Sequence, residues 1–420
     1  MNLNDKLFLE ALKASLENKT VDWDFEINRE AWLMLFQRAE MHQVLPMIYN
    51  VIYKCPSAQT LEKEFLNSFK RKVIRQVMVQ TMRTQEFLVL YQHLLDQNIH
   101  PVMVKGIICR QLYPNPDYRS SSDEDMLVKS REFKECHEAM KSFGMVPGDE
   151  KADLDASYEA SYTLPGSPLY IELHKSLFSP GSEEYGEFNQ FFKSAHARAV
   201  KMRIQDVDVY TLNYTDHLFY LICHAFKHLL HGGFGIRQIC DMVMFANEYG
   251  SQIDWSRIVE NCREIRADKF AVALFQIGEK YLVFDPEKAC YPKEWRDDFV
   301  DEHALLEDLL AGGIYGGATN SRRHSSSLTL NAVKAEKQGK KVKPNIVKAV
   351  FPSRNALRGK YPYLEKYPFL LPVAWTSRIV KYQKETMMDK SSKPIDSIKI
   401  GNQRIELLKQ YGIIKDSLDK

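Results

Sequence analysis

The chain has 420 residues, of which 45% are apolar and 11% aromatic, enough to fill the cores of two or three packed units. Its 57 basic and 55 acidic residues leave a net charge of +2, which excludes the strong positive field of non-specific nucleic-acid binding and disfavours nucleic acid as a partner. Because no apolar run reaches the roughly 18 residues of a membrane span and the N-terminus has no signal-peptide pattern, we expect a cytoplasmic protein without membrane contact.

Residues 1–98 are rich in helix formers with apolar side chains at helical spacing, which predicts a helical N-terminal region. Over 99–180 the pattern changes to short strands alternating with helices, and Gly144 fits the left-handed end of one of these helices. The expected elements are strands at 102–104 and 125–128, helices at 107–112 and 131–142, and a hairpin formed by 158–163 and 169–174.

Two acids one residue apart stand where the second of these strands begins. Side chains alternate between the faces of an extended chain, so Asp123 and Asp125 share one face and Glu124 lies on the other. Two carboxylates on one face suit Mg²⁺ or Mn²⁺ of the kind used in phosphoryl and nucleotidyl transfer. Glu172, on the second hairpin strand with His174 on the same face, is the candidate third carboxylate. Alone, an Asp-x-Asp pair is also common in solvated loops.

Two cations precede the paired acids in the sequence. Lys105 and Gly106 form a turn after the first strand, and Arg119 comes shortly before Asp123. We expect Lys105 and Arg119, with backbone N–H groups at the helix start after Gly106, to hold the β- and γ-phosphates of a nucleotide. Either side chain could instead be a solvated surface cation.

Helical patterns return over 181–311, with Thr215-Asp216 as the expected cap of a helix that runs through Leu230. Four histidines fall near one face of this helix and its end, and they are His217, His224, His228 and His231. We interpret the stripe as the lining of a nucleotide cleft, with zinc binding as the alternative. The seven cysteines have no Cys-x-x-Cys pair and are expected to be reduced thiols.

Arg237 is the last candidate in this helical region. It is expected either to contact the nucleotide or to form an ion pair with Asp241, four residues further on. Beyond it, glycines, serines and a run of lysines over 312–343 predict a flexible basic linker. Residues 344–420 form the C-terminal region.

These motifs resemble those of the bacterial uncharacterised nucleotidyltransferase family, in the superfamily whose best-known member is DNA polymerase β. The matching residues are Val104-Lys105-Gly106, Leu112-Tyr113-Pro114, Arg119, Asp123 with Asp125, Glu172-Leu173-His174, His231-Gly232, and Arg237 with Asp241. The likeness extends to Phe351-Pro352 and Leu371-Pro372. This chain departs from the pattern at Glu124, where an apolar residue is usual, and at Glu172, where aspartate is more usual.

The resemblance implies an α+β, helix-rich fold, in which a small mixed β-sheet nucleotidyltransferase core is packed between helical N-terminal and C-terminal regions. The core is expected over 99–180, with the helical region 181–311 completing the nucleotide cleft.

The resemblance also implies metal-dependent transfer of a nucleoside monophosphate from a nucleoside triphosphate such as ATP, with release of pyrophosphate. Asp123, Asp125 and Glu172 would be the catalytic and metal-binding residues. The nucleotide-binding residues would be Lys105, Gly106, Arg119, His174, His228 and Arg237. The acceptor is expected to be a small molecule or a protein. Two alternatives stay open, a nucleotide-binding scaffold without turnover and a nucleic-acid end-modifying enzyme.

Overall fold

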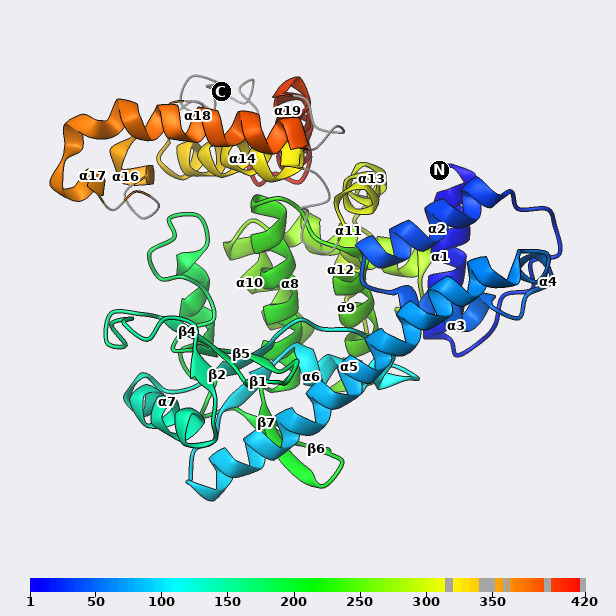
Figure 1. Ribbon diagram of the computed structural model, residues 1–420, viewed down its shortest axis with the longest axis horizontal. Helices are drawn as coiled ribbons and strands as arrows, with labels where there is room; N and C mark the ends of the chain where they lie inside the picture. The colour runs from blue at the N-terminus through cyan, green and yellow to red at the C-terminus, as the bar shows by residue number, and fades with distance from the viewer. Residues whose placement is uncertain are drawn as a thin grey trace. The chain divides into compact units, whose positions relative to one another are not determined.

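The computed structural model describes residues 1–313, 320–339, 351, 353–357, 361, 363–388 and 394–415 (Figure 1). The chain forms two compact units. The first comprises Met1–His224 and Ile236–Glu302, and the second comprises Ala225–Gly235 and His303–Lys420. Among the described residues, no helix combines the length and the apolar character needed to cross a membrane.

The N-terminal part of the first unit is helical, as its periodicity predicts. Its helices are α1 (Leu3–Leu16), α2 (Arg29–Met41), α3 (Leu45–Ile52), α4 (Pro56–Gln59) and α5 (Lys63–Asp96). The side chains of Asn2 and Asn28 accept hydrogen bonds from backbone N–H groups three residues on and cap α1 and α2. The long helix α5, drawn in light blue in Figure 1, continues from this helical part to the sheet, where Phe87 and Tyr91 enter its core.

Seven strands of the described chain form one sheet, in the order β3-β4-β5-β2-β1-β7-β6. Their bounds are β1 (Val102–Val104), β2 (Glu124–Leu127), β3 (Val146–Pro147), β4 (Glu159–Thr163), β5 (Tyr170–His174), β6 (Val200–Ile204) and β7 (Val207–Thr211). The pairs β1–β7 and β2–β5 are parallel and the other pairs are antiparallel, so the sheet is mixed. Together with the many helices, this confirms the helix-rich α+β class.

The strands alternate between an apolar face and a polar face, as the sequence predicts. Met103, Met126, Ile171 and Leu173 are fully buried in one core, together with side chains of α5 and α7. Short helices connect these strands, namely α6 (Gly106–Arg110), η1 (Pro116–Tyr118), η2 (Ser130–Glu132), α7 (Phe133–Ser142) and η3 (Gly186–Phe192). The predicted hairpin is β4–β5, and the helix before Gly144 ends with that glycine at a φ of 102°.

Helices follow β7 and occupy the rest of the first unit. They are α8 (Tyr214–Leu230), α9 (Ile236–Tyr249), η4 (Gly250–Gln252), α10 (Trp255–Glu264), α11 (Asp268–Tyr281) and α12 (Lys293–Arg296). The expected cap of α8 at Thr215-Asp216 is wrong by two residues, because Asn213 Oδ1 accepts a hydrogen bond of 3.0 Å from the Asp216 N–H. The last six residues of α8 belong to the second unit.

The second unit contains a helix where the sequence predicts a flexible linker over 312–343. The described helices are α13 (His303–Gly312), α14 (Asn320–Lys337), α16 (Arg354–Leu357), α17 (Tyr363–Lys366), η5 (Pro368–Leu370), α18 (Leu371–Met388) and α19 (Pro394–Gln410). The linker prediction is therefore wrong over 320–337, because Leu328, Ala332 and Val333 are buried and give α14 an apolar side. The linker residues 314–319 and 340–343 lie outside the described residues. The finer five-region division stays a prediction.

Two buried arginines of this unit donate hydrogen bonds to carbonyl groups at the C-terminal end of α8. Arg404 donates to the carbonyl oxygens of Leu229 and His231, and Arg322 donates to that of Gly232 at 2.9 Å. Both also approach Asp308, at 3.6 Å from Arg404 and 2.6 Å from Arg322. Cationic donors at a helix C-terminus satisfy carbonyl groups that have no partner within the helix.

Candidate active site

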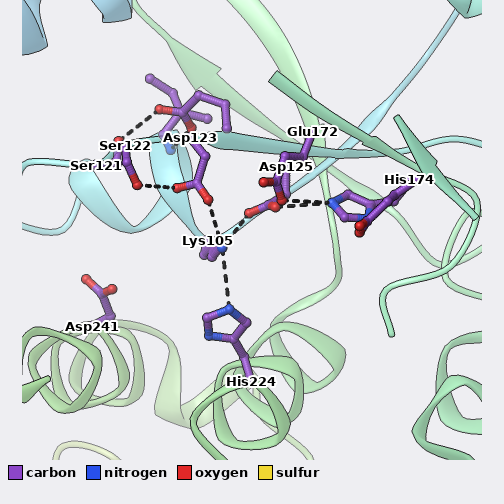
Figure 2. Close-up of polar contacts among 12 residues, drawn as sticks. Lys105, Ser121, Ser122, Asp123, Asp125, Glu172, His174, His224 and Asp241 are labelled. Carbon is purple, nitrogen blue, oxygen red and sulfur yellow. Dashed lines mark hydrogen bonds and ion pairs between the residues drawn. The ribbon is translucent and has the colours of Figure 1, made fainter. Parts of the chain in front are cut away.

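Strand register brings the predicted acids to one face of the sheet. Asp125 of β2 lies opposite Glu172 of β5 and opposite Val104 of β1. Because Lys105 directly follows β1, its side chain reaches the same place (Figure 2). Side chains two residues apart in a strand share a face, so Asp123 and His174 complete the group. The structure thus brings together Lys105, Asp123, Asp125, Glu172 and His174.

The Lys105 ammonium lies between the paired acids. Its Nζ is 2.7 Å from Asp125 Oδ2, 3.7 Å from Asp123 Oδ2 and 3.4 Å from His224 Nε2 (Figure 2). On the other side of Asp125, His174 Nε2 lies 3.2 Å from Oδ1 and also 3.6 Å from Glu172 Oε2. Asp125 is therefore held between two cationic or hydrogen-donating groups.

The donor set fits a hard divalent cation. Ligand atoms of Asp125, Glu172 and His174 all lie within 4.8 Å of one another. Asp123 is outside that group of three, but its carboxylate faces the same ammonium as Asp125. Carboxylate oxygens suit Mg²⁺ or Mn²⁺, whereas imidazole is a softer ligand that transition metals prefer, and a positive charge already occupies the space between the acids. His174, predicted only as a nucleotide-binding residue, is thus also a possible metal ligand.

The ionisation states in this group depend on one another. Burial alone would raise the pKa of Asp125, but the charges of Lys105 and His174 outweigh it and lower that pKa. Burial alone would lower the pKa of His174, but hydrogen bonds to Asp125 and Glu172 raise it to about 9. Burial likewise opposes the charge of Lys105, and Asp123 and Asp125 raise its pKa well above the usual value. Without metal, the cluster therefore carries the Lys105 ammonium, the His174 imidazolium and an ionised Asp125 at neutral pH.

The Lys105-Gly106 turn has an unusual backbone. Lys105 has a φ of 47° and Gly106 a φ of 32°, in the left-handed region that costs a residue with a side chain of order 1–3 kcal/mol. His217 Nε2 accepts a hydrogen bond of 3.1 Å from the Lys105 N–H. Burial lowers the pKa of His217 to about 3, so the ring is neutral, and its Nδ1 lies 3.1 Å from Thr211 Oγ1. His217 therefore supports the turn. The histidine pattern in the sequence predicted only that this residue lines a nucleotide cleft.

Glu124, on the opposite face from the paired acids, fixes this turn from the other side. Its Oε2 accepts a hydrogen bond of 2.7 Å from the Ile107 N–H, and its Oε1 lies 2.6 Å from Arg110 Nη2. Both Glu124 and Arg110 are fully buried. A Cβ at Gly106 would overlap Glu124 Oε2, so glycine is required there. Because Glu124 takes the Ile107 N–H, that group is not available to a phosphate.

The remaining predicted cations are engaged by protein groups. Arg119 is 3% exposed and makes two hydrogen bonds to Asp241, at 3.0 and 2.5 Å, while the Tyr113 hydroxyl donates to the same carboxylate at 2.8 Å. Arg237 donates to the Ser120 carbonyl oxygen and to Gln43 Oε1. These contacts hold the chain that leads into β2. Phosphate binding by Arg119 and nucleotide contact by Arg237 stay predictions.

Helix α8 supplies further residues at the polar face of the sheet. Tyr220 is buried, and burial followed by the charge of Asp125 raises its pKa. The sequence did not predict Tyr220 as a site residue, although it lies at helical spacing between His217 and His224. His228 belongs to the second unit, and its role in nucleotide binding stays a prediction.

A mixed sheet with paired acids on its polar face is a form of site used for metal-dependent phosphoryl and nucleotidyl transfer. The chain belongs to the family described as "Uncharacterised nucleotidyltransferase", whose model matches residues 28–282. That match contains every predicted site residue and ends before Phe351-Pro352 and Leu371-Pro372. Family membership supports a nucleotidyl-transfer function.

A crystal structure of an antigenic nucleotidyltransferase-like protein from Paracoccidioides brasiliensis aligns with 49% of this chain and 96% of its own, with 14% sequence identity and a TM-score of 0.30. No protein with curated annotation matches the chain.

Proposed function

We propose that this protein is a metal-dependent nucleotidyltransferase that moves a nucleoside monophosphate from a nucleoside triphosphate, such as ATP, to a small molecule or a protein and releases pyrophosphate. The observation that carries the proposal is the cluster of Asp123, Asp125 and Glu172 beside Lys105 on one face of the sheet, in a chain of a nucleotidyltransferase family. The DNA polymerase β superfamily, the bacterial source and the cytoplasmic location remain predictions.

Each residue of the cluster has a proposed role. Mg²⁺ or Mn²⁺ held by Asp123, Asp125 and Glu172 would neutralise phosphate charge and favour deprotonation of the attacking group. Glu172 accepts the proton of the nucleophile, since its side chain is the most exposed of the three carboxylates, at 33% against 21% and 5%. His174 fixes the orientation of Asp125 through its hydrogen bond.

The triphosphate is proposed to bind on the Lys105 side of the acids. Lys105 supplies a charge to its phosphates, and the Gly106 turn holds that side chain in place. His174, Arg119 and Arg237 keep their predicted roles in nucleotide binding as parts of this proposal.

The test measures products from each of the four ribonucleoside triphosphates, with Mg²⁺ and a metabolite or protein extract as the source of acceptor. We expect pyrophosphate release and labelling of an acceptor by the wild type, and neither by Asp125→Ala. Asp206→Asn is the matched control, because Asp206 is fully exposed on the β6–β7 turn. Release of orthophosphate would contradict the proposal.

Two alternatives have outcomes of their own in this assay. Tight triphosphate binding without turnover across a broad acceptor screen would favour a nucleotide-binding scaffold. Labelling of nucleic-acid ends with strong salt dependence would favour a nucleic-acid end-modifying enzyme.

A further inference from the structure

A cavity adjoins Glu172 at the β4 side of the sheet. Its volume is about 400 Å³, a size suited to a small molecule. Its walls come from β4, β5 and the segment 148–157 that leads from β3 to β4. Glu172 and Tyr170 of β5 and Glu159 and Ser161 of β4 are among the lining residues. The third acid of the candidate site is therefore also part of the cavity wall.

The order of strands places this cavity on the opposite side of the acids from Lys105. Asp125 of β2 pairs with Glu172 of β5, and Glu172 pairs with Ser161 of β4. Lys105 follows β1, which flanks β2 on its other edge. Going across the sheet, the Lys105 ammonium thus comes first, followed by the paired acids, then Glu172, and then the cavity. An in-line displacement needs its leaving group and its nucleophile on opposite sides of the reacting phosphorus.

The cavity has an acidic lining. Asp149, Glu159 and Glu172 contribute carboxylates, and hydroxyl groups come from Ser157, Ser161 and Tyr170. None of its thirteen lining residues, all in the described part of the chain, is lysine or arginine. His137 also lines the cavity, and burial lowers its pKa below the usual value, so it is neutral at pH 7. This lining repels phosphates and attracts cations.

Contacts between this lining and the candidate active site make the two continuous. Glu159 Oε2 lies 3.7 Å from His174 Nδ1, and the other ring nitrogen of His174 contacts Asp125 and Glu172. A ligand in the cavity therefore lies beside the acid that is proposed to take a proton.

Resting on the proposed function, we infer that this cavity binds the acceptor and that the acceptor is a small molecule with a protonated amino group and hydroxyl groups. Asp149 and Glu159 bind the ammonium, and the hydroxyl groups of the lining bind those of the acceptor. An acceptor hydroxyl oxygen forms a bond to the α-phosphorus as the bond to the bridging oxygen breaks. Pyrophosphate leaves, and the hydroxyl proton passes to Glu172.

The test uses three sugars of similar size that differ in charge as probes: glucosamine, glucose and glucuronate. Binding is measured by ligand-observed NMR on the full chain in EDTA without nucleotide, so the readout does not depend on turnover. We expect glucosamine to bind at least tenfold more tightly than glucose, and glucuronate not to bind. Glu159→Gln and Asp149→Asn should each weaken glucosamine binding by threefold or more.

Asp155→Asn is the matched control, because Asp155 lies in the same 148–157 segment but pairs with Lys134 and does not line the cavity. It should bind glucosamine like the wild type. Equal binding of glucosamine and glucose, or equal losses in Asp155→Asn and Glu159→Gln, would overturn the inference. If the protein binds glucosamine selectively but never releases pyrophosphate, the charge preference of the cavity is supported. That result would count against the proposed nucleotidyltransferase function alone.

Discussion

The three carboxylates of the site differ in exposure and in their partners. Asp125 has 5% of its side chain exposed and contacts both Lys105 and His174. Asp123 is 21% exposed, lies farther from Lys105 and accepts a hydrogen bond of 3.1 Å from Ser122 Oγ, while Glu172 is 33% exposed. A buried acid whose charge is already balanced is a fixed ligand, whereas an exposed one can exchange protons with a substrate. The burial gradient supports the proposed division between Asp125 as a fixed metal ligand and Glu172 as the proton acceptor.

Asp125→Asn should destabilise the protein more than Asp123→Asn. The first change removes the close partner of a half-buried ammonium and a buried imidazole, which we expect to lower the free energy of unfolding by roughly 3 kcal/mol, at the low end for a broken buried ion pair. The second removes a partly exposed contact of 3.7 Å and should cost less than about 1 kcal/mol. Urea denaturation in EDTA measures both. Equal losses would show that the burial gradient has no energetic consequence.

At the scale of elements, the turn between β1 and α6 depends on a residue from β2. Glu124 joins the Ile107 N–H and the Arg110 guanidinium, and both charged side chains are fully buried. The turn that carries Lys105 is thus fixed to the strand that carries Asp125.

Glu124→Gln should lower the free energy of unfolding by roughly 3–5 kcal/mol, because it leaves Arg110 buried without a compensating charge. Glu62→Gln is the control, since its ion pair with Arg29 is exposed and should contribute less than about 1 kcal/mol. Chemical denaturation of both variants gives the comparison. A loss below 1 kcal/mol for Glu124→Gln would contradict the role given to the pair.

The end of α8 provides a second test at this scale. Arg404→Met removes the donors to the Leu229 and His231 carbonyl oxygens, at a cost of about 1–3 kcal/mol for unsatisfied buried acceptors. Hydrogen exchange should become faster for amides at 225–230. Lys409→Met, which removes an ion pair with Glu406 on the same helix, should leave them unchanged. Unchanged protection in Arg404→Met would show that other contacts hold the helix end.

The sequence predicted the parts of the fold that depend on the alternation of side chains between the two faces of a strand. The hairpin, the strand at Asp125 and the shared face of Asp123 and Asp125 all follow from a period of two, and the structure has them. The ion pairs could not be predicted, since they join distant residues. Arg119 meets Asp241 across 122 positions, and nothing near Glu124 shows that Arg110 will balance its charge.

Composition misled the prediction at α14. Serines and lysines favoured a flexible linker, but the apolar residues Leu328, Ala332 and Val333 at helical spacing decided the outcome once α19 was present to pack against. Gly401 of α19 shows the closeness of that packing, because a Cβ there would overlap the Leu328 side chain. Tertiary packing of this kind overrides local composition.

At the scale of the whole molecule, solvent exposure divides the cysteines into two groups. All seven are free, and Cys290 is exposed while the other six are buried. Burial raises the pKa values of Cys109, Cys223 and Cys262, which further slows reaction through the thiolate.

A thiol reagent should therefore react rapidly with one cysteine in the native protein and with seven in denaturant. Cys290→Ser should remove the rapid reaction and leave six thiols in denaturant. Spectrophotometric titration counts them. Rapid reaction of two or more thiols in the native wild type would show that a buried cysteine becomes accessible in solution.

The membership of Ala225–Gly235 in the second unit makes the end of α8 depend on the C-terminal third of the chain. The segment lies in the middle of the chain, inside the family match, yet its partners Arg322 and Arg404 come from the C-terminal third. A stop codon after residue 302 would remove those arginines and leave the carbonyl groups at the end of α8 without them. Deletion of residues 303–420 is therefore expected to destabilise the end of α8, although the family match itself ends at residue 282.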